Sequence, residues 1–392
     1  MASDGERYAF VAHWLDPHSS IIWKYQLMFF TADNSIAMYD IKNKRSFLKR
    51  TPYPSIRPED LYIGATVTVY SRQLKVVGYD DEYTKKRLEH IQMTFALIKP
   101  DGVEKFGELL TEIYKHGFVL KRLKMCTMSP SEAREFYKPH SQEPIFEEMV
   151  LALCSGEVIG MEIIGDDATA RWLKLIGPRD PGIANLEAPN SLRARFGRDK
   201  INNALYGADS KEDMERLRTL FFETPGFGKC PALQKDSTLC IIKPHAVLAG
   251  IAGEIIQHIM QSFNISGMES FNISHVDAAE FCEVYRGVVP EYTLMVQELS
   301  SGPLIGIVVS GVKNPVASSD CEGTTEAPPK TIVGIFRDFC GPADSEIAKI
   351  VRPKTLRAMF GIDKVKNAVH CTDLDEDGLL ECQFFFKTHP KK

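Results

Sequence analysis

The chain contains two copies of one domain-sized segment, and this internal repeat constrains its fold more than any other feature. Residues 94–101 read Thr-Phe-Ala-Leu-Ile-Lys-Pro-Asp, and residues 238–245 read Thr-Leu-Cys-Ile-Ile-Lys-Pro-His. Leu-Arg-Ala-Arg-Phe-Gly at 192–197 returns as Leu-Arg-Ala-Met-Phe-Gly at 356–361. Because the repeated unit is far longer than the roughly 20–50 residues of solenoid repeats, we predict two whole domains in tandem.

The spacing between the two copies locates an insertion in the second. The Ser-Gly pairs that begin at Ser155 and Ser301 lie 146 residues apart (301 − 155), whereas Arg193 and Arg357 lie 164 residues apart (357 − 193). Copy two therefore holds 18 extra residues (164 − 146), and residues 313–330 are the candidate. Their serine, threonine, glycine and proline content is typical of a surface loop, and an insertion without a function is the simplest interpretation.

Each copy shows the same alternation of expected strands and helices. A short apolar strand precedes Lys-Pro, and apolar residues at three- and four-residue spacing then predict an amphipathic helix. A second strand, a second helix and a third strand follow. The first helix and the next two strands fall at 107–114, 118–120 and 157–164 in copy one, and at 253–260, 263–265 and 303–309 in copy two. This order predicts a ferredoxin-like α/β sandwich for each copy.

Residues 1–90 lie outside the repeat and have a different character. Alternation such as Ala-Thr-Val-Thr-Val-Tyr at 65–70 is typical of antiparallel strands, and turn signals such as Thr-Pro-Tyr-Pro at 51–54 separate them. We therefore predict an α+β chain in which a small β-rich domain precedes two tandem sandwiches. The expected divisions are 1–90 for the β-rich domain, 91–223 for copy one, 224–236 for a linker and 237–392 for copy two.

Charge and cysteine spacing argue against several functional classes. The 392 residues carry a formal net charge of −5, which disfavours a dedicated nucleic-acid binder. The nine cysteines include no pair at Cys-x-x-Cys spacing, so neither a zinc cluster nor a redox motif is indicated. The first residues do not resemble a signal peptide, and no stretch approaches about 20 uninterrupted apolar residues. We expect an intracellular protein without membrane association.

Copy two concentrates residues that could perform phosphoryl chemistry. Lysine and arginine are the natural ligands of phosphate, and histidine can accept a phosphoryl group as a covalent nucleophile. A nearby carboxylate can fix the tautomer of such a histidine. Taken alone, each of these residues is more simply explained as a solvated surface group. The candidates are Lys243, Arg337, Arg357, Asn367, His370 and Glu381.

Both copies resemble nucleoside diphosphate kinases. The lysine motif of that family, Ile-Lys-Pro-Asp-Gly-Val, stands at 98–103, and its signature Asn-x-x-His-Gly-Ser-Asp is matched by Asn-Ala-Val-His-Cys-Thr-Asp at 367–373. The resemblance covers roughly residues 93–386, about three quarters of the chain. It implies ping-pong transfer of a γ-phosphoryl group from a nucleoside triphosphate through histidine to a diphosphate, with magnesium on the nucleotide phosphates.

The resemblance implies a role for each candidate in copy two. His370 matches the phosphorylated nucleophile, and Glu381 matches the carboxylate that orients it. The phosphate-binding cations correspond to Lys243, Arg337 and Arg357, and the ribose contact corresponds to Asn367. The same comparison identifies where copy two departs from the family.

The departures in copy two predict a slow site. The base-stacking phenylalanine of the family falls at Pro290 or Glu291. Losing an aromatic stack worth roughly 1–3 kcal/mol should weaken nucleotide affinity by about ten-fold or more. We therefore predict that copy two binds nucleotide and autophosphorylates slowly on His370. The other substitutions place Ala343 at a phosphate-contacting threonine, Cys282 at a tyrosine, and His245-Ala246 after Lys-Pro.

Copy one has lost more of the family's site. The position of the histidine holds Tyr206, and a phenol with a pKa of about 10 is a poor phosphoryl carrier at neutral pH. Leu173, Arg179 and Leu217 stand where the family has arginine, threonine and glutamate. We predict that copy one is catalytically inactive and at most a weak nucleotide binder. Its remaining site residues are Lys99, Tyr137, Arg193 and Asn203.

Residues 5–90 resemble a DM-ten domain through the segments 46–50, 61–72 and 77–83. A DM-ten domain followed by two kinase-like copies is the arrangement of the seven-type homologues within the kinase family. This resemblance implies a microtubule inner protein of the axonemal doublet microtubules of cilia and flagella, with tubulin and the γ-tubulin ring complex as partners. It implies the cytoplasm, the cytoskeleton, the axoneme and the centrosome as locations.

Two functions therefore stay open. The chain is either a structural microtubule protein with a nucleotide-binding second copy, or an active phosphotransferase working through His370. The inactive copy one and the lost base stack favour the first function, because a fold alone does not imply an activity. The retained cations, asparagine, histidine and glutamate of copy two support the second. We also expect the two copies to pack on each other as subunits of kinase oligomers do.

Overall fold

The computed structural model describes residues 6–17, 19–53, 56–70, 72–229, 233–313 and 331–388. Apart from Lys313, the insertion predicted at 313–330 lies outside the described residues. The chain divides into two compact units. One consists of residues 1–93 with 164–168, and the other contains the rest of the chain, including most of both copies.

The first unit is built on one antiparallel sheet, in agreement with the β-rich domain predicted at the start of the chain. Its strand order is β4-β3-β2-β1-β6-β5. A 3₁₀ turn at Pro58–Asp60 precedes β5, and helix α1 (Glu82–Leu88) follows β6. The strands are β1 Arg7–Leu15, β2 Ile22–Phe30, β3 Ser35–Asp40, β4 Arg45–Pro52, β5 Thr66–Val69 and β6 Arg72–Tyr79.

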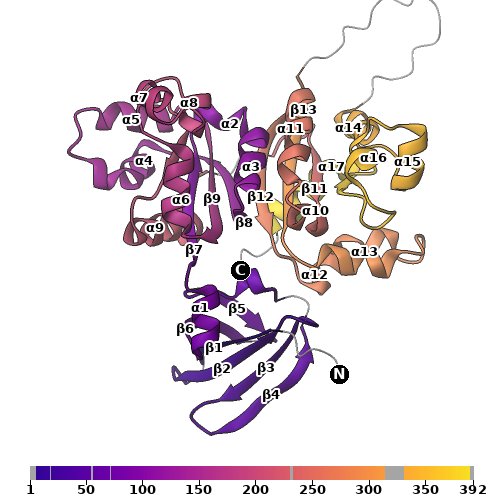
Figure 1. The fold of residues 1–392 in the computed structure, drawn as a ribbon. Helices are drawn as coiled ribbons and strands as arrows, with labels where there is room; N and C mark the ends of the chain where they lie inside the picture. The colour runs from indigo at the N-terminus through magenta and orange to yellow at the C-terminus, as the bar shows by residue number, and fades with distance from the viewer. Residues whose placement is uncertain are drawn as a thin grey trace, which may run out of the picture. The chain divides into compact units, whose positions relative to one another are not determined.

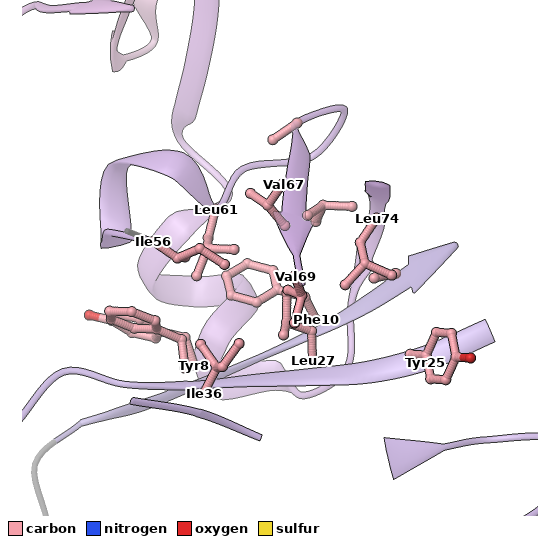
Figure 2. Packing of buried hydrophobic residues seen from close by; sticks show 14 of the residues in the cluster. Tyr8, Phe10, Tyr25, Leu27, Ile36, Ile56, Leu61, Val67, Val69 and Leu74 are labelled. Atoms are coloured by element: carbon pink, nitrogen blue, oxygen red, sulfur yellow. The ribbon is translucent and has the colours of Figure 1, made fainter. Parts of the chain in front are cut away.

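The core of this unit comes from side chains that alternate along the strands. Phe10 of β1, Leu27 of β2 and Leu74 of β6 are fully buried together, as Figure 2 shows. Period-two alternation places such residues on one face of a sheet, and burial of each large apolar side chain stabilises the fold by about 1.5–3 kcal/mol. Helix α1 is fixed to β1 because the Thr84 hydroxyl accepts a hydrogen bond from the Ala9 amide at 2.8 Å.

The two copies have the same order of elements, which confirms the predicted pair of ferredoxin-like sandwiches. Copy one comprises β7 Ile91–Ile98, α2 Pro100–Val103, α3 Phe106–Lys115, β8 Val119–Thr127, α4 Pro130–Phe136, α5 Phe146–Leu153, β9 Glu157–Asp166, α6 Ala168–Ile176, α7 Pro181–Glu187, α8 Leu192–Phe196, β10 Leu205–Gly207 and α9 Lys211–Arg218. Copy two comprises β11 Thr238–Ile242, α10 Pro244–Leu248, α11 Ala252–Ser262, β12 Phe263–Phe271, α12 His275–Phe281, α13 Tyr292–Leu299, β13 Leu304–Val312, α14 Ile332–Cys340, α15 Ser345–Val351, α16 Leu356–Phe360, β14 Val369–Cys371 and α17 Gly378–Gln383.

The two copies share one continuous sheet, so the expectation that they pack on each other is confirmed. The order of its eight strands is β10-β7-β9-β8-β12-β13-β11-β14, and the two halves of this order mirror each other. Strands β8 and β12 meet in the middle, where Lys124 lies opposite Glu269. The Leu123 amide also donates to the Ser270 hydroxyl at 2.8 Å. One chain therefore forms an internal pair of like domains.

Two glycines allow the helices above this junction to approach closely. Helices α3 and α11 lie side by side (Figure 1). A Cβ atom added at Gly107 would lie 2.4 Å from the Gln257 amide nitrogen, and one added at Gly253 would lie 2.5 Å from that of Thr111. Because these neighbours are backbone atoms, they cannot rotate away. Both glycines are therefore required by the packing of the two copies.

The beginning of the expected linker at 224–236 is fixed to copy one. Lys229 pairs with Thr127 of β8 through two backbone hydrogen bonds of 3.1 and 2.8 Å. The buried Lys124 ammonium donates to the Phe227 carbonyl at 2.6 Å. Residues 230–232 lie outside the described residues. Among the helices that the structure describes, none is long and apolar enough to cross a membrane.

Candidate active site

His370 and Glu381, which lie eleven positions apart in the sequence, are in contact. His370 lies on β14, a short strand paired with β11, and Glu381 lies on α17. The His370 Nε2 atom is 3.0 Å from the Glu381 Oε2 atom. A carboxylate only accepts hydrogen bonds, so Nε2 carries the proton and Nδ1 holds the lone pair of the neutral ring. Nδ1 is therefore the nitrogen that can attack phosphorus.

A threonine holds the carboxylate in place. The Thr372 hydroxyl donates to the same Glu381 oxygen at 2.8 Å and accepts from the Leu239 amide at 3.2 Å. The chain of bonds thus runs from the backbone of β11 through Thr372 and Glu381 to the imidazole. Such outer partners fix the orientation of a reacting group. Although Thr372 stands inside the signature segment, sequence reasoning assigned it no role.

The surroundings of His370 raise its pKa. Burial favours the neutral ring and acts in the opposite direction, but the Glu381 charge and its hydrogen bond outweigh burial. The Phe281 ring of α12 packs edge-on against the imidazole with centroids 5.1 Å apart, and only 7% of His370 is exposed. The raised pKa matters for chemistry because a protonated imidazole has no lone pair with which to attack.

We expect Glu381→Gln to move the pH profile of His370 phosphorylation toward lower pH. Labelling by the intact chain should increase as pH rises through the raised pKa of His370, since the neutral ring is the reactive form. The amide removes the negative charge that raises this pKa, so the increase should occur at lower pH, while the maximal rate falls because the ring is less well oriented. Initial labelling rates from pH 5.5 to 9 measure both effects.

The matched control is Glu376→Gln, which changes an exposed carboxylate near the same helix. Its profile should coincide with that of the unmodified chain. If Glu381→Gln lowers the labelling rate but leaves the midpoint of the pH profile unchanged, the assigned electrostatic role of Glu381 would be contradicted.

Two of the predicted phosphate ligands, Lys243 and Arg357, are buried. The Lys243 ammonium donates to the Val365 carbonyl at 2.7 Å, and Arg357 donates to the carbonyls of Gly341 at 2.9 Å and Val369 at 3.1 Å. Within the described residues, neither cation forms an ion pair with a carboxylate. Burial, and secondarily the Arg357 charge, lower the pKa of Lys243 to about 8. A phosphate anion would offset the burial and mutual repulsion of these two positive charges by pairing with both.

The third predicted cation, Arg337 of α14, is placed differently. Its side chain is 55% exposed, and its Nη1 atom donates to the Asp373 carbonyl at 3.1 Å. The Asp373 carboxylate lies 3.5 Å from Arg337 Nε and accepts from the Tyr285 hydroxyl at 2.6 Å. Arg337 therefore belongs to the exposed rim of the site, where its guanidinium contacts Asp373.

Asn367 sits at a strained bend that directs the chain toward His370. The next residue, Ala368, has a left-handed backbone with φ of 68°, which is costly for a residue with a side chain. The Asn367 amide nitrogen donates to the Ala343 carbonyl at 2.7 Å. Its Oδ1 atom is buried and has no hydrogen-bond partner in the described part of the chain. An unpaired buried acceptor of this kind suits a ligand hydroxyl.

The predicted nucleotide would bring its own magnesium. The described residues contain no group of three or more histidine, cysteine, aspartate or glutamate side chains arranged to hold a metal ion. Magnesium commonly binds substrate phosphates and a few carboxylates rather than a complete protein cage. The buried cations and the unpaired asparagine fit the phosphates and ribose of a nucleotide that carries this ion.

In the corresponding site of copy one, two of the retained polar side chains contact each other. The Lys99 ammonium donates to the Asn203 Oδ1 atom at 2.7 Å, so the acceptor that is unpaired in copy two is satisfied here. Burial, and secondarily Arg193, lower the pKa of Lys99 to about 7. Arg193 donates to the Leu205 and Gly177 carbonyls at 3.0 and 2.7 Å. The contacts of Arg193 repeat those of Arg357, so the hydrogen bond between Lys99 and Asn203 is what distinguishes copy one.

Further side chains of copy one contact one another around the position of the lost histidine. Arg179, at the family's threonine position, forms an ion pair with Glu143 at 3.0 Å and donates to His140. His140 also lies against the rings of Tyr137 and Tyr206. The Tyr206 hydroxyl donates to Asp213 at 3.1 Å, and burial raises the pKa of this phenol above its ordinary value. A phenol that stays protonated cannot relay a phosphoryl group.

The position expected for base stacking carries a charge in copy two. Glu291 caps the start of α13, and its carboxylate accepts from the Lys364 ammonium at 2.9 Å. At a second substituted position, His245 donates from Nδ1 to the buried Glu298 carboxylate at 2.8 Å. Cys282, at the family's tyrosine position, is buried at the end of α12. These contacts were not predicted, because each joins residues far apart in the sequence.

A family model described as nucleoside diphosphate kinase matches residues 92–226 and 236–390. A model described as the N-terminal PH domain of nucleoside diphosphate kinase 7 matches residues 2–90, where the sequence suggested a DM-ten domain.

The individual relatives agree with these models. Nucleoside diphosphate kinase homolog 7 of Rattus norvegicus is 46% identical over 391 residues, which are 98% of this chain and 94% of the relative. The Mus musculus homolog 7 is 45% identical with the same coverage. The crystal structure of the Aquifex aeolicus nucleoside diphosphate kinase shows 39% identity and a TM-score of 0.33, covering 34% of this chain and 95% of that one.

Proposed function

Since the chain belongs to the nucleoside diphosphate kinase family, we propose that its second copy accepts a γ-phosphoryl group on His370 and passes it to a nucleoside diphosphate. The observation that carries this proposal is the 3.0 Å contact between His370 Nε2 and Glu381. It fixes the tautomer in which Nδ1 is nucleophilic. Within the described residues, the buried cations Lys243 and Arg357 have no carboxylate partners, which supports the same function.

The reaction divides into two phosphoryl transfers. Lys243 and Arg357 bind the phosphates and neutralise the charge that develops on them, while Arg337 contributes from the rim. Nδ1 of His370 attacks the γ-phosphorus, the bond to the bridging oxygen breaks, and the nucleoside diphosphate leaves. A second diphosphate then attacks the phosphohistidine and restores the neutral ring. Magnesium, when bound with the nucleotide, neutralises further phosphate charge.

We propose that turnover is slow because the nucleotide is held by its phosphates and ribose rather than by its base. Glu291, at a position expected for a stacking ring, is engaged with Lys364. The absent stack, worth roughly 1–3 kcal/mol, should raise the nucleotide dissociation constant by about ten-fold or more.

Incubation of the full chain with magnesium and ATP labelled at the γ-phosphate tests the proposal. We expect a phosphoryl label that is stable in base and lost in acid, as a phosphoramidate is, and that unlabelled GDP removes as GTP. Absence of the label, or a label on serine or threonine that GDP does not remove, would contradict the assigned activity.

We propose in addition that the chain is a structural component inside ciliary and flagellar doublet microtubules, with tubulin and the γ-tubulin ring complex as partners. Copy one supports this second function, because the whole domain is retained although Tyr206 stands at the histidine position and Lys99 is hydrogen-bonded to Asn203. Such a domain contributes half of the continuous sheet and so serves as a scaffold. The cytoskeleton, the axoneme and the centrosome are the corresponding locations.

For the structural function, we expect the His370→Ala chain to restore axoneme integrity in cells that lack this protein. The substitution removes the phosphoryl acceptor and leaves the scaffold. Electron microscopy of the doublets, with density located for the chain, measures the outcome. Failure of rescue at normal protein abundance would show instead that catalysis is the required function.

A further inference from the structure

A buried histidine and a buried glutamate of copy two meet beside the predicted phosphate-binding lysine. His245 stands two residues after Lys243, in the first turn of α10, and Glu298 lies near the end of α13. The Glu298 carboxylate accepts from the His245 backbone amide at 3.1 Å and from the His245 Nδ1 atom at 2.8 Å. The two side chains are only 10% and 7% exposed. The pair therefore fixes a carboxylate inside the protein, next to the segment that carries Lys243.

Glu298 is ionised at neutral pH and is held by the histidine. Burial raises the pKa of its carboxyl group, but the two hydrogen bonds from His245 lower this pKa below its ordinary value. Because a carboxylate only accepts hydrogen bonds, His245 donates from Nδ1, and its Nε2 atom holds the lone pair of the neutral ring. Nε2 is buried and has no hydrogen-bond partner in the described part of the chain. Within the described residues, Glu298 is therefore the sole hydrogen-bond partner of this ring.

Lys243 lies close to this carboxylate but does not pair with it. Its ammonium group has three donors, and within the described residues the Val365 carbonyl accepts the one hydrogen bond that the group forms. Burial and the Arg357 charge lower the pKa of Lys243, and the Glu298 charge acts in the opposite direction, as a nearby negative charge does. Two donors of a buried ammonium group thus remain for a phosphate, while a carboxylate that could take them lies nearby.

Copy one has a different carboxylate beside its lysine. Subtracting the offsets of the repeat (245 − 144 and 298 − 146) leads from the pair to Asp101 and Ala152. The Asp101 carboxylate accepts from the Ala204 amide at 2.8 Å, and Lys99 forms no ion pair within the described residues. In both copies a donor from a distant part of the chain therefore engages the carboxylate. Copy two has exchanged both positions together, so that its carboxylate comes from α13 and the donor from α10.

From these contacts we infer that His245 is a positioning residue of the phosphate site: it holds the Glu298 carboxylate away from the Lys243 ammonium group and so leaves that group free to bind phosphate. The inference rests on the proposed function, because it takes a nucleotide phosphate as the ligand of Lys243. Sequence reasoning identified His245 only as a departure from the family's aspartate, since its partner stands 53 positions later in the chain.

Removing the His245 side chain should lead Glu298 to pair with Lys243. The substitution takes away the Nδ1 donor and leaves a buried carboxylate with one stabilising hydrogen bond fewer. A buried ammonium group with unused donors lies close by, and pairing would compensate both buried charges. A lysine that pairs with a carboxylate of its own chain is no longer available to phosphate. Loss of this charge-assisted contact should weaken nucleotide binding by about ten-fold or more.

The experiment measures the dissociation constant of the full chain for ATP with magnesium by isothermal titration calorimetry. We expect His245→Ala to raise this constant by about ten-fold or more. Adding Glu298→Ala to that variant should restore the constant to within about three-fold of the original, because the competing carboxylate is gone. Such recovery identifies competition for Lys243 rather than a loss of structure. His245→Asn should also bind within about three-fold of the original, since its amide nitrogen, like Nδ1, is attached to the γ carbon and can donate to Glu298.

His275→Ala is the matched control, since it removes an exposed histidine of the same copy. Its affinity for ATP should equal that of the unmodified chain. Thermal unfolding identifies any variant that has failed to fold. In that case His245→Phe, which keeps a ring and removes the donor, replaces His245→Ala. Likewise Glu298→Gln replaces Glu298→Ala, because its amide keeps an acceptor for the backbone amide of residue 245 and carries no charge.

Three results would overturn the inference: a His245→Ala chain that binds ATP as tightly as the original, a weakened His245→Ala chain that Glu298→Ala does not restore, or an unmodified chain that binds neither ATP nor inorganic tripolyphosphate. Labelling of His370 in the same samples separates this inference from the proposed transferase. If the affinities follow the expected pattern but His370 is never labelled, the transferase activity fails and the role of His245 stands. If His370 is labelled and His245→Ala binds ATP normally, the transferase stands and the role of His245 fails.

Discussion

Replacing His370 with alanine should abolish phosphoryl labelling of the full chain, with a loss of at least about a thousand-fold. Glu381 and Thr372 orient the imidazole as a nucleophile, and removal of a covalent nucleophile typically costs several orders of magnitude. The side chain is small and buried, so alanine leaves the strand pairing of β14 intact. Initial rates of label incorporation from γ-labelled ATP measure the loss.

Tyr206→Phe provides the matched control, because it changes the equivalent position of copy one. It removes one hydroxyl that donates to Asp213 and should leave the labelling rate within about two-fold of the original. ATP affinity measured for His370→Ala should change little, since Lys243 and Arg357 remain. Persistent labelling of the His370→Ala chain at the original rate would show that another residue accepts the phosphoryl group.

Gly253→Ala should destabilise the unit that contains both copies by about 1–3 kcal/mol. The added methyl group would lie 2.5 Å from the Thr111 amide nitrogen and 2.8 Å from the Gly107 carbonyl oxygen, so α3 and α11 must move apart. Alanine ordinarily stabilises a helix by about 0.5–1 kcal/mol relative to glycine. A net loss of stability in Gly253→Ala would therefore come from the close approach of α3 and α11. Urea unfolding followed by circular dichroism measures the difference.

Gly334→Ala is the comparison for this substitution. Gly334 also lies in a helix, α14, but the nearest atom to its added Cβ is 3.6 Å away, at ordinary contact distance. We expect it to be neutral or stabilising by up to about 1 kcal/mol. Equal effects of the two substitutions would mean that the close approach of α3 and α11 does not limit stability.

Much of the fold followed from the repeat and its periodicity. The alternation of strands and helices predicted both sandwiches, and the matches to kinase models and to the homolog 7 proteins confirm the resemblance to the seven-type homologues. The contact between His370 and Glu381 was expected from the family resemblance, which matches Glu381 to the carboxylate that orients the histidine. The continuous sheet through β8 and β12 was expected only as packing of the copies, since no local pattern specifies which edge strands meet.

The remaining features depend on contacts that sequence separation hides. The ion pair between Arg179 and Glu143 in copy one joins positions 36 residues apart, and no spacing rule predicts such a pair. Arg337 was grouped with Lys243 and Arg357 as a phosphate ligand, but its exposure at the rim follows from where α14 ends rather than from its residue type.

The number of nucleotide sites per chain tests the central claim most directly, because the two copies share a fold and differ in the residues and contacts of the site. In copy one Lys99 is bonded to Asn203, whereas in copy two the Asn367 acceptor is unpaired. Equilibrium dialysis of the full chain against labelled ATP with magnesium measures the stoichiometry. We predict one site per chain, lost in Lys243→Gln. Two sites of similar affinity, or one site that survives Lys243→Gln, would contradict the account.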